Sequence, residues 1–319
     1  MAAPPFRTLR PWLLERFGRP VHRVALDAGS TCPNRDGSLG RGGCTYCDVE
    51  GSGTGALRSG HELGQQLEAG IRRVARRRRA GEPPAGVIAY FQSYSNTYVE
   101  TERLREVLSV VEPRLGDPVV AVSVATRPDT LPDAALEVLA GLAERVPVWV
   151  ELGLESADDA VLARINRLHS AADFEDAAAR SRAAGLLVVG HAILGLPGDG
   201  REGARRTADL LAATGVAGVK VHNLMVLRRT QMEHAWRRGE LEVLDAPTYV
   251  AWLADFVERL APGQVLHRLT GDADRDVRLA PTWDVHKNAV RGMLADELRR
   301  RGTLQGARCG LASAPQSSR

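Results

Sequence analysis

Cysteine is scarce in this chain of 319 residues, which contains only four, and three of them lie close together at Cys32, Cys44 and Cys47. An odd number of closely spaced thiols, without a secretory signal, argues against a disulfide framework and for thiols that stay reduced. The fourth, Cys309, lies near the C-terminus, where we expect an incidental thiol. Thiol chemistry is therefore expected in one short segment.

Long hydrophobic runs are also missing. No apolar run approaches the roughly 18 to 20 residues that a membrane-spanning helix needs. The first twenty residues lack the apolar centre of a signal peptide. Because 44% of the residues are hydrophobic, the chain can still bury a large core. We therefore expect a globular, cytoplasmic protein with no membrane partner.

Lysine is nearly absent, since the 42 basic residues include only Lys220 and Lys287, which leaves 40 arginines. One arginine cluster is prominent, made of Arg72, Arg73 and the run Arg76 to Arg79. Such a cluster could grip the phosphates of RNA. A basic helix end is also favoured by the helix dipole and by solvent. Both interpretations stay open.

Hydrophobic periodicity predicts alternating strands and helices. The expected strands are residues 22–27, 86–91, 119–125, 148–154, 186–194 and 218–226, and the expected helices between them are residues 61–79, 100–114, 132–145, 157–165, 171–184 and 203–213. Six such units imply parallel strands with their loops gathered at the carboxyl ends. Periodicity does not separate a doubly wound sheet from a partial barrel, although no GxGxxG follows the first strand, which lowers the dinucleotide-binding alternative.

The chain divides into four parts by this pattern. Residues 1–20 form a lead-in with a short helix at residues 11–17, and residues 21–230 form the α/β unit. Residues 231–302 form an extension with helices expected at 247–260 and 285–301, placed across the open side of the α/β unit. Residues 303–319 contain scattered Ser, Pro and Gly, and we expect a mobile tail there.

The loop after the first strand reads STCPNRDGSLGRGGCTYC and is rich in glycine. Three thiolates on a cuboidal iron-sulfur cluster would leave one iron without a protein ligand, because a closed cluster normally takes four cysteines. That iron could bind a cofactor or substrate. Cys44 and Cys47 could instead form part of a zinc site, although structural zinc needs a second pair of ligands and only His61 stands near. Incidental thiols are the third alternative.

This loop resembles the cluster loop of the radical S-adenosylmethionine (SAM) superfamily, with eleven residues between Cys32 and Cys44. Tyr46 stands where the superfamily has an aromatic residue before the third cysteine. The spacing is similar to that of the YhcC-type branch and of the radical SAM half of the Elongator catalytic subunit. The resemblance implies a partial (β/α)6 TIM-like barrel with a helical C-terminal extension, a 4Fe-4S cluster on Cys32, Cys44 and Cys47, and SAM at the barrel mouth.

The resemblance also implies SAM contacts from other strand ends. The branch that includes oxygen-independent coproporphyrinogen oxidase has SAM-contacting residues at the positions of Glu155 and Arg167, and the arginine could pair with the methionyl carboxylate. His191 occupies a third such position, although a histidine in an apolar strand is often a core residue. Gln92 and Ser93 replace the usual glycine-rich stretch, as in the Elongator-like pattern QSY.

Alternation along two strands adds further polar candidates. Glu151 and Glu155 share one face of the fourth expected strand, and Lys220 and His222 share one face of the sixth. Inside a cavity, Lys220 and His222 could hold an anionic group of the cofactor or substrate. Lys220 could alternatively point outward past a helix. Glu151 needs a partner if it is buried.

The function implied by the resemblance is reductive cleavage of SAM, which generates a 5′-deoxyadenosyl radical that abstracts hydrogen from an unidentified substrate. An external electron donor such as flavodoxin or ferredoxin is implied as well. The relationship to Elongator and the arginine cluster make tRNA a candidate substrate. The competing hypothesis is a non-catalytic RNA-binding module whose cysteines hold zinc. Metal content separates the two hypotheses, because the enzyme should contain iron and the RNA-binding module should contain zinc.

Overall fold

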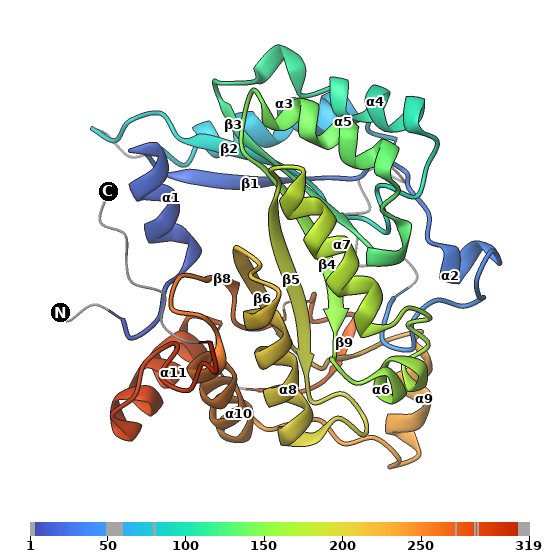
Figure 1. Cartoon of the computed structure of the whole chain (residues 1–319), viewed down its shortest axis with the longest axis vertical. Helices are drawn as coiled ribbons and strands as arrows, with labels where there is room; N and C mark the ends of the chain where they lie inside the picture. Colours follow the sequence, from blue (N-terminus) through green and yellow to red (C-terminus); the bar gives the residue numbers. More distant parts are fainter. Residues whose placement is uncertain are drawn as a thin grey trace.

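The computed structural model describes residues 4–48, 60–78, 81–271, 273–283, 285 and 287–311. A seven-stranded parallel sheet in the order β1-β2-β3-β4-β5-β6-β8 forms its centre (Figure 1). The strands are β1 (Val21–Leu26), β2 (Gly86–Phe91), β3 (Val119–Thr126), β4 (Val148–Glu155), β5 (Leu187–Leu194), β6 (Gly218–Asn223) and β8 (Val265–Arg268). The sheet curls into a half-barrel, so the predicted α/β partial barrel is confirmed.

Helices connect the strands and cover the outer face of the sheet. They are α1 (Leu9–Phe17), α2 (Pro33–Asp36), α3 (Leu63–Ala75), α4 (Thr101–Ser109), α5 (Asp133–Ala143), α6 (Asp159–Arg164), α7 (Ala171–Ala183), α8 (Gly200–Ala213), α9 (Gln231–Arg237), α10 (Ala246–Arg259) and α11 (Lys287–Arg301). Helices α3, α4 and α8 are amphipathic and bury one side, as Leu67 and Val74 of α3 illustrate. None of the described helices is long and apolar enough to cross a membrane.

The central strands are buried on both faces, because helices pack outside and other side chains pack inside. All residues of β2, β3 and β4 are buried, which fits their runs of Val, Ile, Leu and Ala. Helix α1 closes the amino-terminal end of the barrel, where Leu13 packs against Ile88 and Trp149. The ring of Trp12 meets Trp149 edge to face with centroids 5.8 Å apart. This end is therefore filled, and any cavity must lie toward the other end.

The structure differs from the predicted elements at the sixth strand. The expected strand 218–226 is two strands, because β6 ends at Asn223 and β7 (Val226–Leu227) pairs antiparallel with β9 (Arg278–Ala280). A further parallel strand, β8, lies in the expected extension and pairs with β6, with Lys220 opposite Arg268. Four residues are too few to show an alternating pattern, which is why sequence periodicity missed β8.

Residues 303–309, within the expected mobile tail, are packed against the start of the chain. Gln305 is 3% exposed. Its backbone N–H donates to the carbonyl of Pro5, and its side chain accepts from the N–H of Arg7 and donates to the carbonyl of Gln264. A mobile tail would not make these bonds. Cys309 ends this stretch, where its backbone N–H donates to the carbonyl of Gly306, and residues 312–319 lie outside the described part.

Candidate functional site

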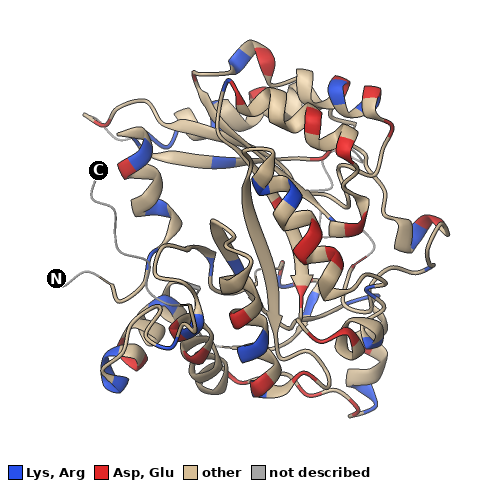
Figure 2. Cartoon of the chain, in the orientation of Figure 1, with Lys and Arg blue, Asp and Glu red and all other residues tan. Residues whose placement is uncertain are grey.

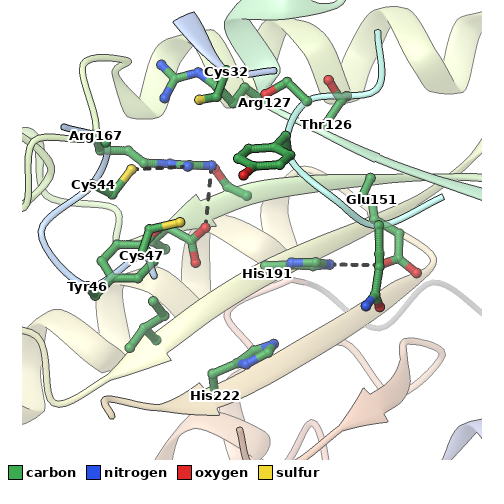
Figure 3. Close-up of a pocket in the computed structure, with 18 of the residues that line it drawn as sticks. Cys32, Cys44, Tyr46, Cys47, Thr126, Arg127, Glu151, Arg167, His191 and His222 are labelled. Atoms are coloured by element: carbon green, nitrogen blue, oxygen red, sulfur yellow. Dashed lines mark hydrogen bonds and ion pairs between the residues drawn. The ribbon is translucent and has the colours of Figure 1, made fainter. Parts of the chain in front are cut away.

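A cavity of about 240 Å³ lies at the carboxyl ends of the strands and is lined by the three clustered cysteines (Figure 3). The other predicted residues that line it are Tyr46, Gln92, Glu151, Glu155, Arg167, His191 and His222. Ser93 and Lys220 are buried but do not line the cavity. Side chains from β2, β4, β5 and β6 thus meet the cysteine loop in one place.

The three cysteines are positioned by two tight turns. Cys32 precedes α2, where Pro33 takes the first helical position and the Cys32 carbonyl accepts from the N–H of Asp36. The N–H of Cys47 donates to the carbonyl of Cys44 over 3.0 Å. Among the described residues, no three His, Cys, Asp or Glu side chains are close enough to hold a single metal ion. A cluster does not require such convergence, because each thiolate binds its own iron.

Arg35 neutralises charge beside Cys47. Burial raises the pKa of the Cys47 thiol to about 12, and the Arg35 guanidinium opposes this. Arg35 also donates to the carbonyls of Cys47 and Asp48. A Cβ at Gly43, where φ is +79°, would meet Arg35 at 2.9 Å, so glycine leaves room for this side chain. The loop therefore fits a group that binds thiolates, because metal binding stabilises the deprotonated form.

Arg167 joins the cysteine loop to β4. Its Nη1 lies 3.6 Å from the Cys44 sulfur, and its Nη2 donates to the carbonyl of Gly153 over 3.0 Å and lies 3.4 Å from Glu155 Oε1. Its Nε donates to Nε2 of His169 over 2.8 Å. Burial, then the nearby Arg167, lowers the pKa of His169 to about 3, so this ring is a neutral acceptor. Four contacts fix the guanidinium at the cavity wall.

Glu155 has an unusual backbone. Its φ is +70°, and the register of β4 with β5 shifts between Gly153 and Glu155. Positive φ is uncommon for residues other than glycine and is found often at functional sites. A register shift of this kind is typical of a β-bulge. Glu155 lines the cavity beside Arg167, as does Glu151, with which it shares a face in the expected alternation.

Glu151 is the centre of a buried polar network inside the barrel. It is 1% exposed and accepts from Ser123 Oγ at 2.8 Å, from His191 Nε2 at 3.0 Å and from Lys220 Nζ. Although burial opposes ionisation, Lys220 and His191 hold the pKa of Glu151 well below its ordinary value. Lys220 thus points inward, contrary to the outward alternative. Its charge pairs with Glu151 rather than facing a ligand.

Two histidines continue from this network toward the opening. The rings of His191 and His222 have centroids 5.9 Å apart. Burial lowers the pKa of both, so both rings are neutral near pH 7. Nε2 of His222 is buried and has no hydrogen-bond partner among the described residues.

Sequence reasoning missed three arginines that line the cavity, which are Arg35, described above, Arg127 and Arg268. Arg127 follows β3 and is 2% exposed, and its Nε and Nη2 bind the carboxylate of Asp129 at 2.8 and 2.7 Å. Its Nη1 is buried without a partner in the described part of the chain. Arg127 directly follows an expected strand, and this position in the sequence could have indicated a residue of the site. Arg268 belongs to β8, and without that strand no signal assigned it to the barrel interior.

Two family models match the chain. One, described as the radical SAM superfamily, matches residues 32–211, and one described as the radical SAM C-terminal domain matches residues 216–300. YtqA of Bacillus subtilis is 38% identical over 301 residues, which are 94% of this chain and 92% of that protein. YhcC of Escherichia coli K12 is 35% identical over 272 residues, 85% of each chain. Both relatives are therefore similar over most of their length.

More distant similarities concern proteins longer than this chain. A tRNA uridine(34) acetyltransferase of Dehalococcoides mccartyi is 26% identical over 183 residues, which are 55% of this chain and 38% of that protein. The structure of an N-terminally deleted archaeal Elp3 of Methanocaldococcus infernus superposes with a TM-score of 0.69 at 17% identity. The match covers 90% of this chain and 64% of that chain, and it shows a shared fold.

The thiol-lined cavity at the barrel mouth lies in the part of the chain that the superfamily model matches. Together with two full-length relatives above 30% identity, this confirms the expected resemblance. The chain is similar to YtqA and YhcC and belongs to the radical SAM superfamily, a superfamily of enzymes that use a 4Fe-4S cluster and SAM.

Proposed function

We propose that this enzyme holds its cluster on Cys32, Cys44 and Cys47 and binds SAM in the same cavity to begin hydrogen abstraction from a substrate. The observation that carries the proposal is the meeting of the three thiols with Arg167 in one cavity. When bound and reduced by an external donor such as flavodoxin or ferredoxin, the cluster supplies the electron that cleaves SAM.

The cavity walls supply suitable contacts for SAM. Arg167 can receive the methionyl carboxylate, because its charge is only partly matched by Glu155, with which it makes a 3.4 Å ion pair. Tyr46, Gln92 and His191 line the same space and are the further contacts we propose. Ser93 and Lys220 are buried and do not line the cavity, and we propose that they pack behind the residues that do. These residues exclude water and orient the cofactor, while the cofactor itself performs the difficult chemistry.

Replacement of one cysteine tests this function. After anaerobic reconstitution, the wild type should contain about four irons per chain and form 5′-deoxyadenosine from SAM on reduction with dithionite. Cys44→Ala should lose most of the iron and all SAM cleavage. Cys309→Ala is the matched control and should behave as the wild type, because Cys309 does not line the cavity.

The opposite result has a definite meaning. Zinc in place of iron, with no 5′-deoxyadenosine from the wild type, would contradict the enzyme function. It would favour the RNA-binding module with a zinc site.

For the substrate we propose RNA, and tRNA first. The support is the similarity to a protein named for uridine 34 of tRNA and the fold shared with Elp3. The arginine cluster gives less support. Arg72, Arg73 and Arg76 are exposed at the end of α3 that leads to the start of β2, opposite the cysteine loop, and Arg79 lies outside the described residues. Figure 2 shows basic and acidic residues intermixed on the outer helices in this view.

Addition of tRNA to the reduced enzyme tests the RNA proposal. We expect tRNA to increase the rate of 5′-deoxyadenosine formation, because a correctly bound substrate accepts the radical. Single-stranded DNA of equal charge is the control for a general polyanion effect. An equal rate with tRNA, with DNA and with neither would contradict RNA as the substrate and leave the SAM chemistry unaffected.

A further inference from the structure

The cavity has a second end, formed by His222 of β6 and Arg268 of β8. Arg268 lies opposite Lys220 in the sheet, three positions before β6 ends at Asn223. The cysteine loop follows β1 on the opposite edge of the sheet. Figure 3 shows His222 apart from the three cysteines, and its ring lies near that of His191. We call Arg268 and His222 the arginine end of the cavity.

Arg268 is the charged group at this end of the cavity. It lines the cavity and is partly buried, and no side-chain hydrogen bond or ion pair connects its guanidinium to another residue in the described part of the chain. Most arginines inside this molecule are paired, as Arg167, Arg127 and Arg301 show. Withdrawing an unpaired charge from water costs free energy, so Arg268 is held in a state that an anion would stabilise.

His222 is a second unsatisfied group at this end. Its Nε2 is buried and has no partner among the described residues. Its ring is neutral, because burial and then Arg268 lower its pKa. A neutral imidazole can donate one hydrogen bond from Nε2 to an oxygen atom. His222 and Arg268 both line the cavity, and each carries a hydrogen-bond donor without a partner among the described residues.

The charge balance behind these groups is positive. Lys220 pairs with Glu151, and Arg23 lies against His267, with its Nη2 3.1 Å from Nδ1. Arg268 adds a third cation. Burial lowers the pKa of Lys220 to about 7, so its charge is not complete at neutral pH. Among the described residues of β4, Glu151 is the carboxylate beside this group, and the two arginines already outweigh its single negative charge. The field at the arginine end attracts an anion.

We propose that the arginine end binds an oxyanion of the substrate, either a carboxylate or a phosphate, and so holds the rest of the substrate between Arg268 and the cysteines. The planar guanidinium suits two oxygens of such a group. The cavity volume of about 240 Å³ admits a compact group at this end. The proposal rests on the proposed function for the identity of the substrate site, but the anion contact is measurable without turnover.

Titration calorimetry tests the site directly. Reconstituted protein is saturated with SAM, without a reductant, so that the Arg167 site is filled. It is then titrated with methyl phosphate and separately with acetate at constant ionic strength. We expect the wild type to bind at least one of them and Arg268→Gln to bind it at least about tenfold more weakly, as expected for loss of a charged hydrogen bond. Arg103→Gln, the same change on the outside of α4, should bind as the wild type.

Two further variants separate recognition from folding. Arg268→Lys keeps the charge but loses the planar fork, and it should bind with intermediate affinity. His222→Phe should weaken binding without removing Arg268. Iron content and the thermal transition of each variant verify that the barrel is intact. Tighter binding of methyl phosphate indicates a phosphorylated substrate, and tighter binding of acetate indicates a carboxylate.

The outcomes separate this proposal from the proposed function. Absence of binding by the wild type, or equal binding by the wild type and a folded Arg268→Gln variant, would overturn the anion site even if SAM is cleaved. Binding that depends on Arg268, in a protein that forms no 5′-deoxyadenosine, would support the anion site and overturn the proposed function.

Discussion

The position of Arg167 depends on the absence of a side chain at Gly153. A Cβ at this position would collide with Nη2 of Arg167, which donates to the carbonyl of Gly153 itself. The collision involves the end of a flexible side chain, so the barrel can keep its backbone while the guanidinium moves. Gly153 therefore affects ligand binding more than folding.

We predict that Gly153→Ala weakens SAM binding and leaves iron content nearly unchanged. The displaced guanidinium loses its hydrogen bond to the Gly153 carbonyl and no longer has the orientation that we propose for binding SAM. We therefore expect the affinity for SAM to fall by about tenfold to a hundredfold. Equilibrium binding of SAM to the reconstituted, oxidised protein measures this affinity. Gly141→Ala in α5 is the control, because nothing lies within 4 Å of its added Cβ. Unchanged affinity in Gly153→Ala would show that Arg167 does not hold SAM.

Sequence reasoning at the residue scale was strongest for the cysteines and weakest for buried charges. Three thiols in a glycine-rich loop indicate a shared ligand through their chemistry alone. Lys220 and Ser93 are residue types that can bind a polar ligand, and both were predicted as contacts of the cofactor. Lys220 pairs with Glu151 across the barrel, however, and neither side chain lines the cavity. A partner 69 positions away in the sequence is decided by how the strands pack, which local pattern does not contain.

At the scale of elements, the pair of Glu151 and Lys220 connects β4 with β6 through the interior, across β5. Both side chains are 2% exposed or less. Removing one partner of a buried pair leaves the other charge without compensation, which is worse than removing both. The pair therefore holds β4 and β6 together through the interior of the barrel.

We predict that Lys220→Met destabilises the fold by about 3 to 5 kcal/mol, because Glu151 stays buried without its cation. The double variant Lys220→Met with Glu151→Gln should recover most of this loss. Urea unfolding followed by circular dichroism measures both. Arg103→Gln, which breaks the exposed pair with Glu106, should change the midpoint little. A Lys220→Met midpoint equal to that of the wild type would refute this account of the network.

At the scale of the whole molecule, Asp255 holds the C-terminal helices to the barrel. This residue of α10 is 4% exposed, and its carboxylate binds Arg201 and Arg205 of α8 and Arg301 of α11 at 2.6 to 2.7 Å. Although burial opposes ionisation, these arginines hold its pKa far below the ordinary value. One carboxylate therefore ties three helices together.

Asp255→Asn should reduce stability by about 3 kcal/mol, because three arginines lose their shared anion. Iron content at room temperature should stay that of the wild type, since the change is remote from the cysteine loop. Chemical unfolding and iron analysis of one preparation measure both quantities. The control is Asp296→Asn, whose exposed pair with Arg299 contributes little. Equal stability of the two variants would contradict this role of Asp255.

The sequence by itself determined the places of the six main strands, the cysteine-rich loop and the family. Long apolar runs identify buried parallel strands, and the spacing of three thiols is a local property. The tertiary structure alone decided which polar side chains share the cavity. It brought in Arg268 on a four-residue strand, and it withdrew Lys220 into an ion pair. The physical reason is that alternation along a strand sets only the side of the sheet on which a side chain lies. Its position along the barrel and its partners depend on the register between strands.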